Sequence, residues 1–232
     1  MIDFDKDDVK VKRIIKVFVN STIELMEKEG IENITVRKVA EISGYNPATI
    51  YNYFDNSRQL IFFASINFMN DYFKEIEQIL DNNNNPLDTY IKLWETFCRY
   101  SFKNPKIYYS IFGENIEEKP TILINKYFKL YPEDFKYSST VYLPLLTDNS
   151  NEQDNITQPL KKCVENNYFT LKEAKNIDEV NMLYYHGMLS LLVNNRLSYT
   201  VDEAIEKTME HIRQVVNNFA GQNKDLLKEK DY

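Results

Sequence analysis

One short segment, residues 47–54, carries side chains whose tips can hydrogen-bond to base edges and to phosphate oxygens. At helical spacing, its small and polar residues share a face that we expect to be exposed: Ala48, Thr49, Asn52 and Tyr53. The opposite face can turn inward and consists of Ile50, Tyr51 and Phe54. This division suits a helix that enters a groove of DNA, whereas the alternative is a helical hairpin that only fills a core.

The residues before this segment predict the elements that position it. Thr35 is a good N-cap for a first short helix, because its hydroxyl can accept a backbone N–H. Gly44 supplies the left-handed residue that ends this helix. Asn46 then caps a second helix, and Pro47 takes its first position, where no N–H is missed. The apolar side of the first helix is expected to consist of Val39, Ala40 and Ile42.

A third helix is predicted directly after the polar segment. Asn56 and Gln59 have the spacing of a capping pair at its start. Two short helices that are joined by a tight turn and followed at once by a third helix form a helix-turn-helix. This architecture places one helix in the major groove of DNA.

Residues 12–60 resemble the DNA-binding domain of TetR-family transcriptional regulators. An amphipathic first helix, RIIKVFVNSTIELMEKEG, ends at Gly30. The matching features that follow in order are Ile34-Thr35, Val39-Ala40, Gly44, Thr49-Ile50-Tyr51, Tyr53-Phe54 and Leu60. The resemblance implies a homodimeric repressor that binds a palindromic operator in double-stranded DNA. It also implies release from the operator by a small apolar or aromatic effector.

The resemblance and the expected exposed positions together assign the candidate DNA contacts. These are Thr35, Arg37, Asn46, Pro47, Ala48, Thr49, Tyr51, Asn52, Tyr53 and Arg58, of which Tyr51 is expected partly to pack inward and partly to reach a phosphate. The chain departs from the family pattern at Ser57, where many members carry a Lys for a DNA phosphate, and Arg58 follows in its place. This departure keeps open a second reading, in which a degenerate DNA-binding domain belongs to an adaptor or co-activator that acts through protein contacts.

The composition favours long regular helices. The 232 residues include only 5 Gly and 7 Pro, and no alternating strand pattern stands out, so we expect an all-α fold. The predicted domains are a helix-turn-helix domain at 8–56, a helical effector-binding and dimerisation domain at 57–220, and a polar tail at 221–232. Because the net charge is −7, the positive charge available to phosphates is local: Lys10, Lys12, Arg13, Lys16, Arg37 and Lys38.

The sequence indicates no catalysis, cofactor or metal site. It has two histidines, His186 and His211, and two cysteines, Cys98 and Cys163, without the spacing of a nucleophilic or metal-binding motif. No Gly-rich phosphate loop or dinucleotide motif is present. We find neither an apolar run that could cross a membrane nor a signal peptide, so we expect a cytoplasmic protein with reduced thiols.

The remaining sequence predicts a series of helices with a candidate effector pocket among them. The expected helices lie at 57–80, 87–102, 105–113, 121–130, 156–169, 178–196 and 201–219, with a polar loop at 147–155. The resemblance places the pocket in the middle of the chain. Its candidate lining residues are Trp94, Phe97, Cys98, Tyr108, Tyr109, Phe112, Tyr127, Tyr142, Tyr168, Tyr184 and His186. For each of them the alternative is an ordinary place in the core.

The last two predicted helices are the candidate dimer interface. The helix at 178–196 is apolar nearly all round in its middle, so it must be covered on more than one side. Thr200 and Glu203 form a capping box for the final helix. In TetR-family proteins these two helices pair with their copies. The implied interface residues are Gly187, Ser190, Ile205, Ile212 and Val216, and the alternative is a pair of core helices in a monomer.

Overall fold

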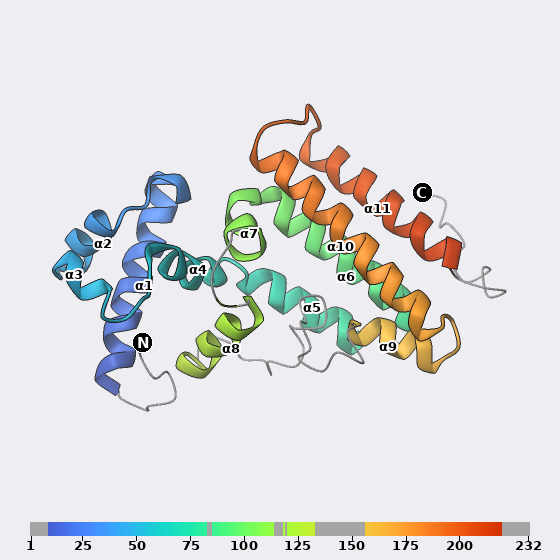
Figure 1. Ribbon diagram of the computed structural model, residues 1–232, viewed down its shortest axis with the longest axis horizontal. Coiled ribbons are helices and arrows are strands. Elements are labelled where there is room, and N and C mark those ends of the chain that lie inside the picture. The colour runs from blue at the N-terminus through green and yellow to red at the C-terminus, as the bar shows by residue number, and fades with distance from the viewer. Residues whose placement is uncertain (1–8, 83–84, 114–117, 119, 133–155, 220–232) are drawn as a thin grey trace. The chain divides into compact units, whose positions relative to one another are not determined.

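The computed structural model describes residues 9–82, 85–113, 118, 120–132 and 156–219, and every regular element in these ranges is a helix (Figure 1). The elements are α1 (Val9–Glu29), the short 3-10 helix η1 (Ile31–Asn33), α2 (Val36–Ser43), α3 (Pro47–Ile50), α4 (Ser57–Asn67), α5 (Asn70–Asn82), α6 (Pro86–Lys103), α7 (Pro105–Phe112), α8 (Pro120–Leu130), α9 (Gln158–Glu165), α10 (Leu171–Val193) and α11 (Val201–Phe219). The all-α prediction is therefore confirmed.

The chain divides into two compact units. Unit 1 comprises residues 1–71 and 106–139, and unit 2 comprises residues 72–105 and 140–232. Thus α4, α7 and α8 belong to the same compact unit as α1 to α3. The predicted domain boundary after residue 56 stays a prediction. The predicted tail at 221–232, the polar loop at 147–155 and Tyr142 lie outside the described residues.

Unit 1 is built around the apolar side of α1. Phe18 is fully buried, and its ring lies 5.1 Å from that of Tyr45 and 5.9 Å from that of Tyr53. On α4, Phe63 packs against Phe54 at 5.8 Å and against Tyr127 of α8 at 5.7 Å. The short helices α2 and α3 are thereby attached to a core that also contains α4 and α8.

The capping residues predicted from the sequence take the expected roles. The Thr35 hydroxyl accepts the Lys38 N–H at 3.3 Å, and Asn46 Oδ1 accepts the Ala48 N–H at 2.9 Å. Asn56 Oδ1 accepts the Gln59 N–H at 3.0 Å. The reciprocal bond is displaced by one residue, because Gln59 Oε1 accepts the N–H of Asp55 rather than that of Asn56. The entry of the chain into α2, α3 and α4 is therefore fixed by local hydrogen bonds.

Gly44 ends α2 in the left-handed conformation, with φ of 72°. A Cβ at this position would meet nothing within 4 Å, so a substitution costs backbone strain alone. We expect Gly44→Ala to lower the free energy of unfolding by about 1–2 kcal/mol. Glu41→Ala, at an exposed position of the same helix, is expected to change it by less than about 0.5 kcal/mol. Urea denaturation of both variants tests this, and equal stabilities would contradict it.

Three predicted helices have different bounds in the structure. The helix expected at 57–80 is interrupted: α4 ends at Asn67, and the N–H groups of Phe68 and Met69 form tight-turn bonds to Ser65 O at 3.1 Å and Ile66 O at 2.9 Å. The helix expected at 156–169 is shortened to α9. The helix expected at 178–196 begins earlier, at Leu171, because Thr170 and Glu173 form a capping box there.

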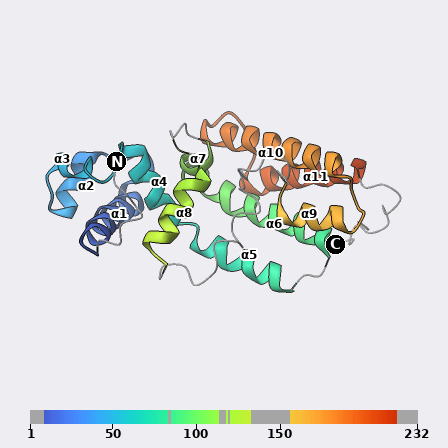
Figure 2. The ribbon, with the colours of Figure 1, turned by 60° about the horizontal axis from the view of Figure 1, so that its bottom comes forward.

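In unit 2, α6 lies against α9, α10 and α11 (Figure 2). The α6 side chains Trp94 and Phe97 are fully buried, and their rings lie 5.9 and 4.7 Å from that of Tyr185 on α10. The capping box predicted for the last helix is confirmed: Glu203 accepts the Thr200 N–H at 2.7 Å, and the Thr200 hydroxyl accepts the Glu203 N–H at 3.2 Å. Unit 2 thus has an aromatic core between α6 and α10.

Candidate nucleic-acid interface

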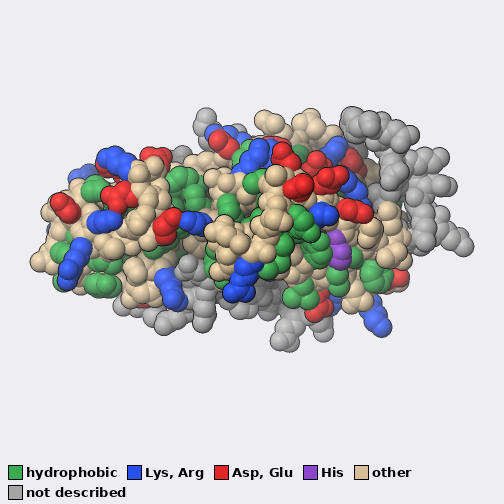
Figure 3. All heavy atoms as spheres, turned by 90° about the horizontal axis from the view of Figure 1, so that it is seen from above, with side chains coloured by type: hydrophobic (Ala, Val, Ile, Leu, Met, Phe, Trp, Pro, Cys, Tyr) green, Lys and Arg blue, Asp and Glu red, His purple; other side chains and the backbone are tan. Residues whose placement is uncertain are grey.

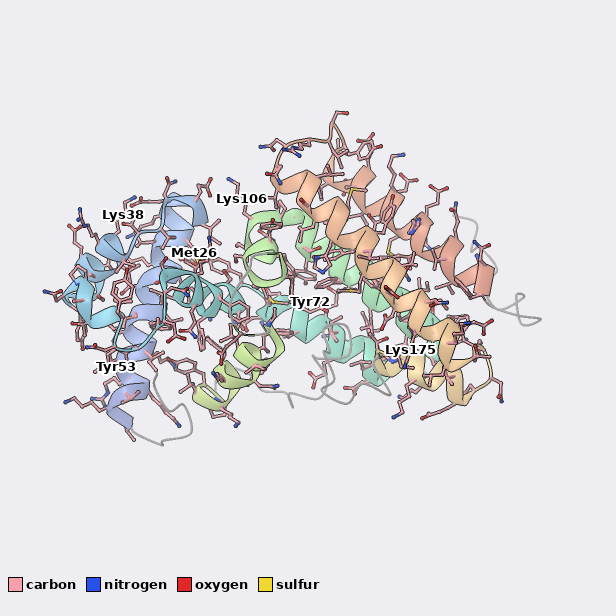
Figure 4. The ribbon with its side chains drawn as sticks, viewed as in Figure 1. Met26, Lys38, Tyr53, Tyr72, Lys106 and Lys175 are labelled. Atoms are coloured by element: carbon pink, nitrogen blue, oxygen red, sulfur yellow. The ribbon has the colours of Figure 1, made fainter. Side chains whose placement is uncertain are left out.

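The outer side of α2, α3 and the turn after them carries the residues predicted to contact DNA. The exposed members of the set are Thr35, Arg37, Asn46, Pro47, Ala48, Tyr51, Asn52 and Arg58, and the half-buried members are Thr49 and Tyr53. Tyr53 and Lys38 both belong to this part of unit 1 (Figure 4). The structure therefore gathers the predicted contacts on the adjoining elements α2 and α3 and at the start of α4.

Two side chains expected to turn inward are exposed instead. Tyr51 is 56% exposed and Ile42 is 40% exposed. The prediction for Tyr51 assumed a helix that continues to residue 54, but α3 ends at Ile50. The next residues form a turn in which the Asn52 N–H bonds to Thr49 O at 3.1 Å and the Tyr53 N–H bonds to Ile50 O at 2.9 Å. This turn directs Tyr51 to the surface, while Tyr53 packs in part on Phe18.

The two basic residues at the start of α2 differ in their availability to phosphates. Lys38 Nζ pairs with Glu29 Oε2 at 2.6 Å and also donates to Asn33 O at 3.0 Å. Arg37 is exposed, and it forms no ion pair with any residue that the structure describes. Its guanidinium can therefore bind a phosphate without first breaking an internal salt bridge.

Within unit 1, α7 and α8 are joined to the elements around the interface by polar contacts. Lys106 Nζ on α7, labelled in Figure 4, pairs with Glu32 Oε1 of η1 at 2.5 Å. This pair holds the pKa of the Glu32 carboxyl below its usual value. The Tyr131 hydroxyl, just after α8, donates to Lys12 O of α1 at 3.4 Å. The ion pair is exposed, so it orients the helices more than it stabilises them, whereas the Tyr131 bond is part-buried.

The candidate effector residues are divided between the two units. Unit 2 contains Trp94, Phe97 and Cys98, which are fully buried, and Tyr168, Tyr184 and His186, which are half-buried. Unit 1 contains Tyr108 and Tyr127, which are buried, and Tyr109 and Phe112, which are half-buried. Trp94 and Phe97 meet in one aromatic core, and Tyr184 instead stacks on His211 with ring centroids 3.9 Å apart. Burial lowers the pKa of both His186 and His211.

The sequence reasoning missed a polar group within the core of unit 2. It consists of Tyr90, Asp178, Asn181 and the N-terminal cap of α9, Thr157. Asp178 and Asn181 lie one turn apart on α10, and Tyr185 follows at the next turn. A signal was available, since polar residues at helical spacing within an apolar helix are unusual unless they bond to one another.

The predicted dimer residues differ in exposure. Ile212 and Val216 have no exposed surface even in the single chain, whereas Gly187 is exposed and Ser190 and Ile205 are half-buried. Leu183, at 66% exposed, is the most exposed of the apolar side chains of α10 that lie at the surface, which also include Val180 and Leu191. Figure 3 shows hydrophobic side chains gathered beside a histidine over the part of the molecule that holds α10 and α11.

A family model described as "Bacterial regulatory proteins, tetR family" matches residues 18–63, which include all of α2 and α3. A curated relative, the HTH-type transcriptional regulator SAB2452 of Staphylococcus aureus (strain bovine RF122 / ET3-1), is 20% identical over 127 residues, or 54% of this chain and 69% of the relative. Residues 18–63 therefore form a TetR-type DNA-binding domain, and the two matches together support a TetR-family transcriptional regulator. The predicted family is thereby confirmed.

Solved structures of transcriptional and degradation regulators share the fold of this chain. Thermus thermophilus FadR, a repressor crystallised with lauroyl-CoA, is 14% identical with a TM-score of 0.55 and matches over 94% of this chain and 98% of its own. FadR of Bacillus halodurans is 15% identical with a TM-score of 0.52 over 90% and 96%. At these identities the likeness establishes the fold alone. None of the described helices of this TetR-family chain is long and apolar enough to cross a membrane.

Proposed function

We propose that this TetR-family chain is a dimeric repressor that binds a palindromic operator through α2 and α3 and is released by a small-molecule effector. The observation that carries the proposal is the face formed by Arg37, Thr49, Tyr51 and Asn52. It presents a cation and several hydrogen-bonding groups at the surface of a rigidly capped helix-turn-helix. In such an arrangement phosphate contacts position the protein and base contacts select the sequence.

We assign Thr49 and Asn52 to base edges, and Arg37 and Tyr51 to phosphates. Thr49 and Asn52 lie on α3 and in the turn after it, where the second helix of a helix-turn-helix enters the major groove. Asn side chains can bond in two places to adenine, and Thr can bond to several bases. The exposed Tyr51 hydroxyl and the unpaired Arg37 guanidinium suit the phosphate oxygens. Arg58 takes the phosphate position that Ser57 does not fill.

The proposed contacts predict two kinds of variant. Thr49→Ala or Asn52→Ala is expected to weaken operator binding by about 1–3 kcal/mol and to relax the sequence preference. Arg37→Ala is expected to weaken binding to all sequences and to reduce the salt slope by about one. Lys38→Ala is the matched control for Arg37, because Lys38 is already paired with Glu29. Fluorescence anisotropy over a salt series measures both the operator affinity and its dependence on salt. Identical salt slopes for Arg37→Ala and Lys38→Ala would contradict the assignment.

The dimer is proposed to form through the exposed side of α10 and the adjoining side of α11. Gly187, Ser190 and Ile205 remain in the proposed interface, and we add Leu183, whose side chain is largely exposed in the single chain. Ile212 and Val216 are already covered by their own chain, so we propose them as supports rather than contacts. A symmetric dimer would place two α3 helices on half-sites one helical turn apart, about 34–36 Å along the DNA.

Release by an effector requires an element that connects the helical core to the interface. We propose α4 for this role, as a single short helix rather than the continuous helix expected from the sequence. It begins directly after the turn that carries Asn52, and Phe63 within it touches both Phe54 and Tyr127. The hydroxyls of Ser65 on α4 and Ser110 on α7 are 2.9 Å apart. A shift of α7 or α8 would therefore displace α4 and, with it, the turn that carries Asn52.

This coupling predicts a reciprocal effect on the two ligands. An effector that weakens operator binding by about 1–3 kcal/mol must itself bind more weakly, by the same factor, in the presence of operator. The test is to titrate an effector found by thermal-shift screening into the protein with and without operator. Equal effector affinities in the two titrations would show that the effector site does not control DNA binding.

The alternative function is an adaptor that acts through protein contacts with a degenerate DNA-binding domain. Ser57, in place of the family's Lys, is the observation that favours it. A gel shift with genomic fragments at low salt separates the two proposals. A retained fragment supports the repressor, and the absence of any retained fragment supports the adaptor.

A further inference from the structure

A polar cluster lies between α6 and α10 in unit 2, centred on the hydroxyl of Tyr90. This hydroxyl donates to Asp178 Oδ1 at 3.4 Å and accepts from Asn181 Nδ2 at 3.0 Å. Asp178 Oδ2 accepts the N–H of Thr157 at 3.0 Å. Tyr90 and Asn181 have no exposed surface, whereas Asp178 is half-buried and so keeps the cluster in reach of solvent. We call these four residues the Asp178 cluster.

Two buried polar atoms of the cluster, Asn181 Oδ1 and Thr157 Oγ1, lack a hydrogen-bond partner among the described residues. Both residues are more than nine-tenths buried, since Asn181 is 0% exposed and Thr157 is 4% exposed. Buried polar atoms in native proteins are almost always hydrogen-bonded, so the unpaired amide oxygen of Asn181 and the unpaired hydroxyl of Thr157 mark a place that can accept from a donor.

The cluster also contains a carboxyl group, that of Asp178, which pairs with no basic side chain among the described residues. Burial raises the pKa of Asp178 to about 7, although the Thr157 N–H and the Tyr90 hydroxyl act in the opposite direction. A carboxyl in such surroundings gains stability from a cation that replaces the water it has lost.

One aromatic ring lies beside the cluster, and a second lies beside the first. The ring of Trp94 on α6 lies 6.4 Å from that of Tyr90, and the ring of Tyr185 on α10 lies 5.9 Å from that of Trp94. Both Trp94 and Tyr185 are fully buried. Aromatic faces attract the apolar part of an organic ligand and also stabilise a nearby ammonium group through its positive charge.

We propose that the Asp178 cluster binds the ammonium group of an amine effector, whose organic part lies against Trp94 and Tyr185. An ammonium group has three N–H donors, and the carboxylate of Asp178, Oδ1 of Asn181 and Oγ1 of Thr157 provide three acceptors. The inference rests on the proposed effector response and narrows the effector from apolar or aromatic compounds to amines. A carboxylate ligand would meet the like charge of Asp178 instead.

The test uses the full-length protein and a panel of primary amines. Each amine is paired with the alcohol and the carboxylate of closely similar skeleton, beginning with 2-phenylethylamine, 2-phenylethanol and 3-phenylpropanoate. Isothermal titration is expected to show that the best amine binds at least tenfold more tightly than its alcohol and carboxylate counterparts. A panel in which no amine binds better than its counterparts would overturn the proposal.

Two variants and one control variant locate the binding. Asp178→Asn keeps the shape of the side chain and removes its charge, so it is expected to weaken amine binding at least tenfold. Glu179→Gln removes an exposed charge from the next position of α10 and is expected to leave amine binding unchanged. Asn181→Leu removes an acceptor without changing the charge, and an intermediate loss is expected. Unchanged amine affinity in a folded Asp178→Asn protein would overturn the assignment.

Operator binding, measured in parallel, separates this inference from the proposed function. If a carboxylate compound releases the operator and no amine binds, the repressor proposal is supported and the amine site is refuted. If an amine binds through Asp178 and operator affinity does not change, the amine site is supported and effector release by it is refuted. Each result therefore supports one proposal and refutes the other, so the two can fail separately.

Discussion

Replacing Leu183 by Asp is expected to convert the dimer into a folded monomer. Leu183 is 66% exposed in the single chain, so the substitution should change the stability of the monomer by less than about 0.5 kcal/mol. In the proposed interface the same carboxylate would be buried without a partner in each of two copies, at a cost of several kcal/mol. The dissociation constant should therefore rise by at least about 100-fold.

Sedimentation velocity at micromolar concentration, together with far-UV circular dichroism, measures assembly and folding at once. Lys161→Asp, at an exposed position of α9, is the matched control and should leave the dimer intact. Ile212→Asp is expected to behave differently, because Ile212 is fully buried within its own chain and the variant should unfold. A Leu183→Asp protein that stays dimeric would place the interface elsewhere.

Replacing Asp178 by Asn is expected to stabilise the protein at pH 8. The folded-state pKa of Asp178 is raised to about 7, against about 3.9 in an unfolded chain. Between these values the folded state holds a proton that the unfolded state has lost, so stability falls as pH rises through this window. Since Asp178 is only half-buried, we expect the stability lost across this whole pH window to be on the order of 2–4 kcal/mol.

Urea denaturation of both proteins from pH 4.5 to pH 8, at one protein concentration, measures this difference. The advantage of Asp178→Asn should be small at pH 4.5 and should grow until about pH 7. His186 and His211 titrate in both proteins, so their contribution cancels in the comparison. A stability difference that does not vary with pH would show that burial does not raise the pKa of the Asp178 carboxyl.

The local features of the fold could be predicted because local chemistry determines them. Thr35, Asn46 and Asn56 cap their helices through atoms only two or three residues away. Gly44 adopts a left-handed conformation that residues with a side chain rarely adopt. The capping box at Thr170 is of the same kind as the one predicted at Thr200. Its signal was present in the sequence, and the start of α10 was nevertheless placed seven residues too late.

Other features depend on contacts between distant parts of the chain. The interruption after Asn67 contains neither Gly nor Pro, so no local signal marks it. Helical periodicity identified the apolar side of α11 but could not show that its own chain covers Ile212. The same limit applies to the candidate site: Tyr51 is exposed because α3 is short, and Tyr90 and Asn181 meet across 91 positions of sequence.

The most direct test of the central proposal is selection of DNA duplexes by the purified protein at low salt. The proposal predicts enrichment of an inverted repeat, with half-sites whose centres lie one helical turn or a multiple of it apart. A Thr49→Ala, Asn52→Ala double variant, folded and dimeric, should lose this enrichment while it retains weak binding to all duplexes. No enriched sequence, or the same enriched sequence with the double variant, would contradict the proposal that α3 reads an operator.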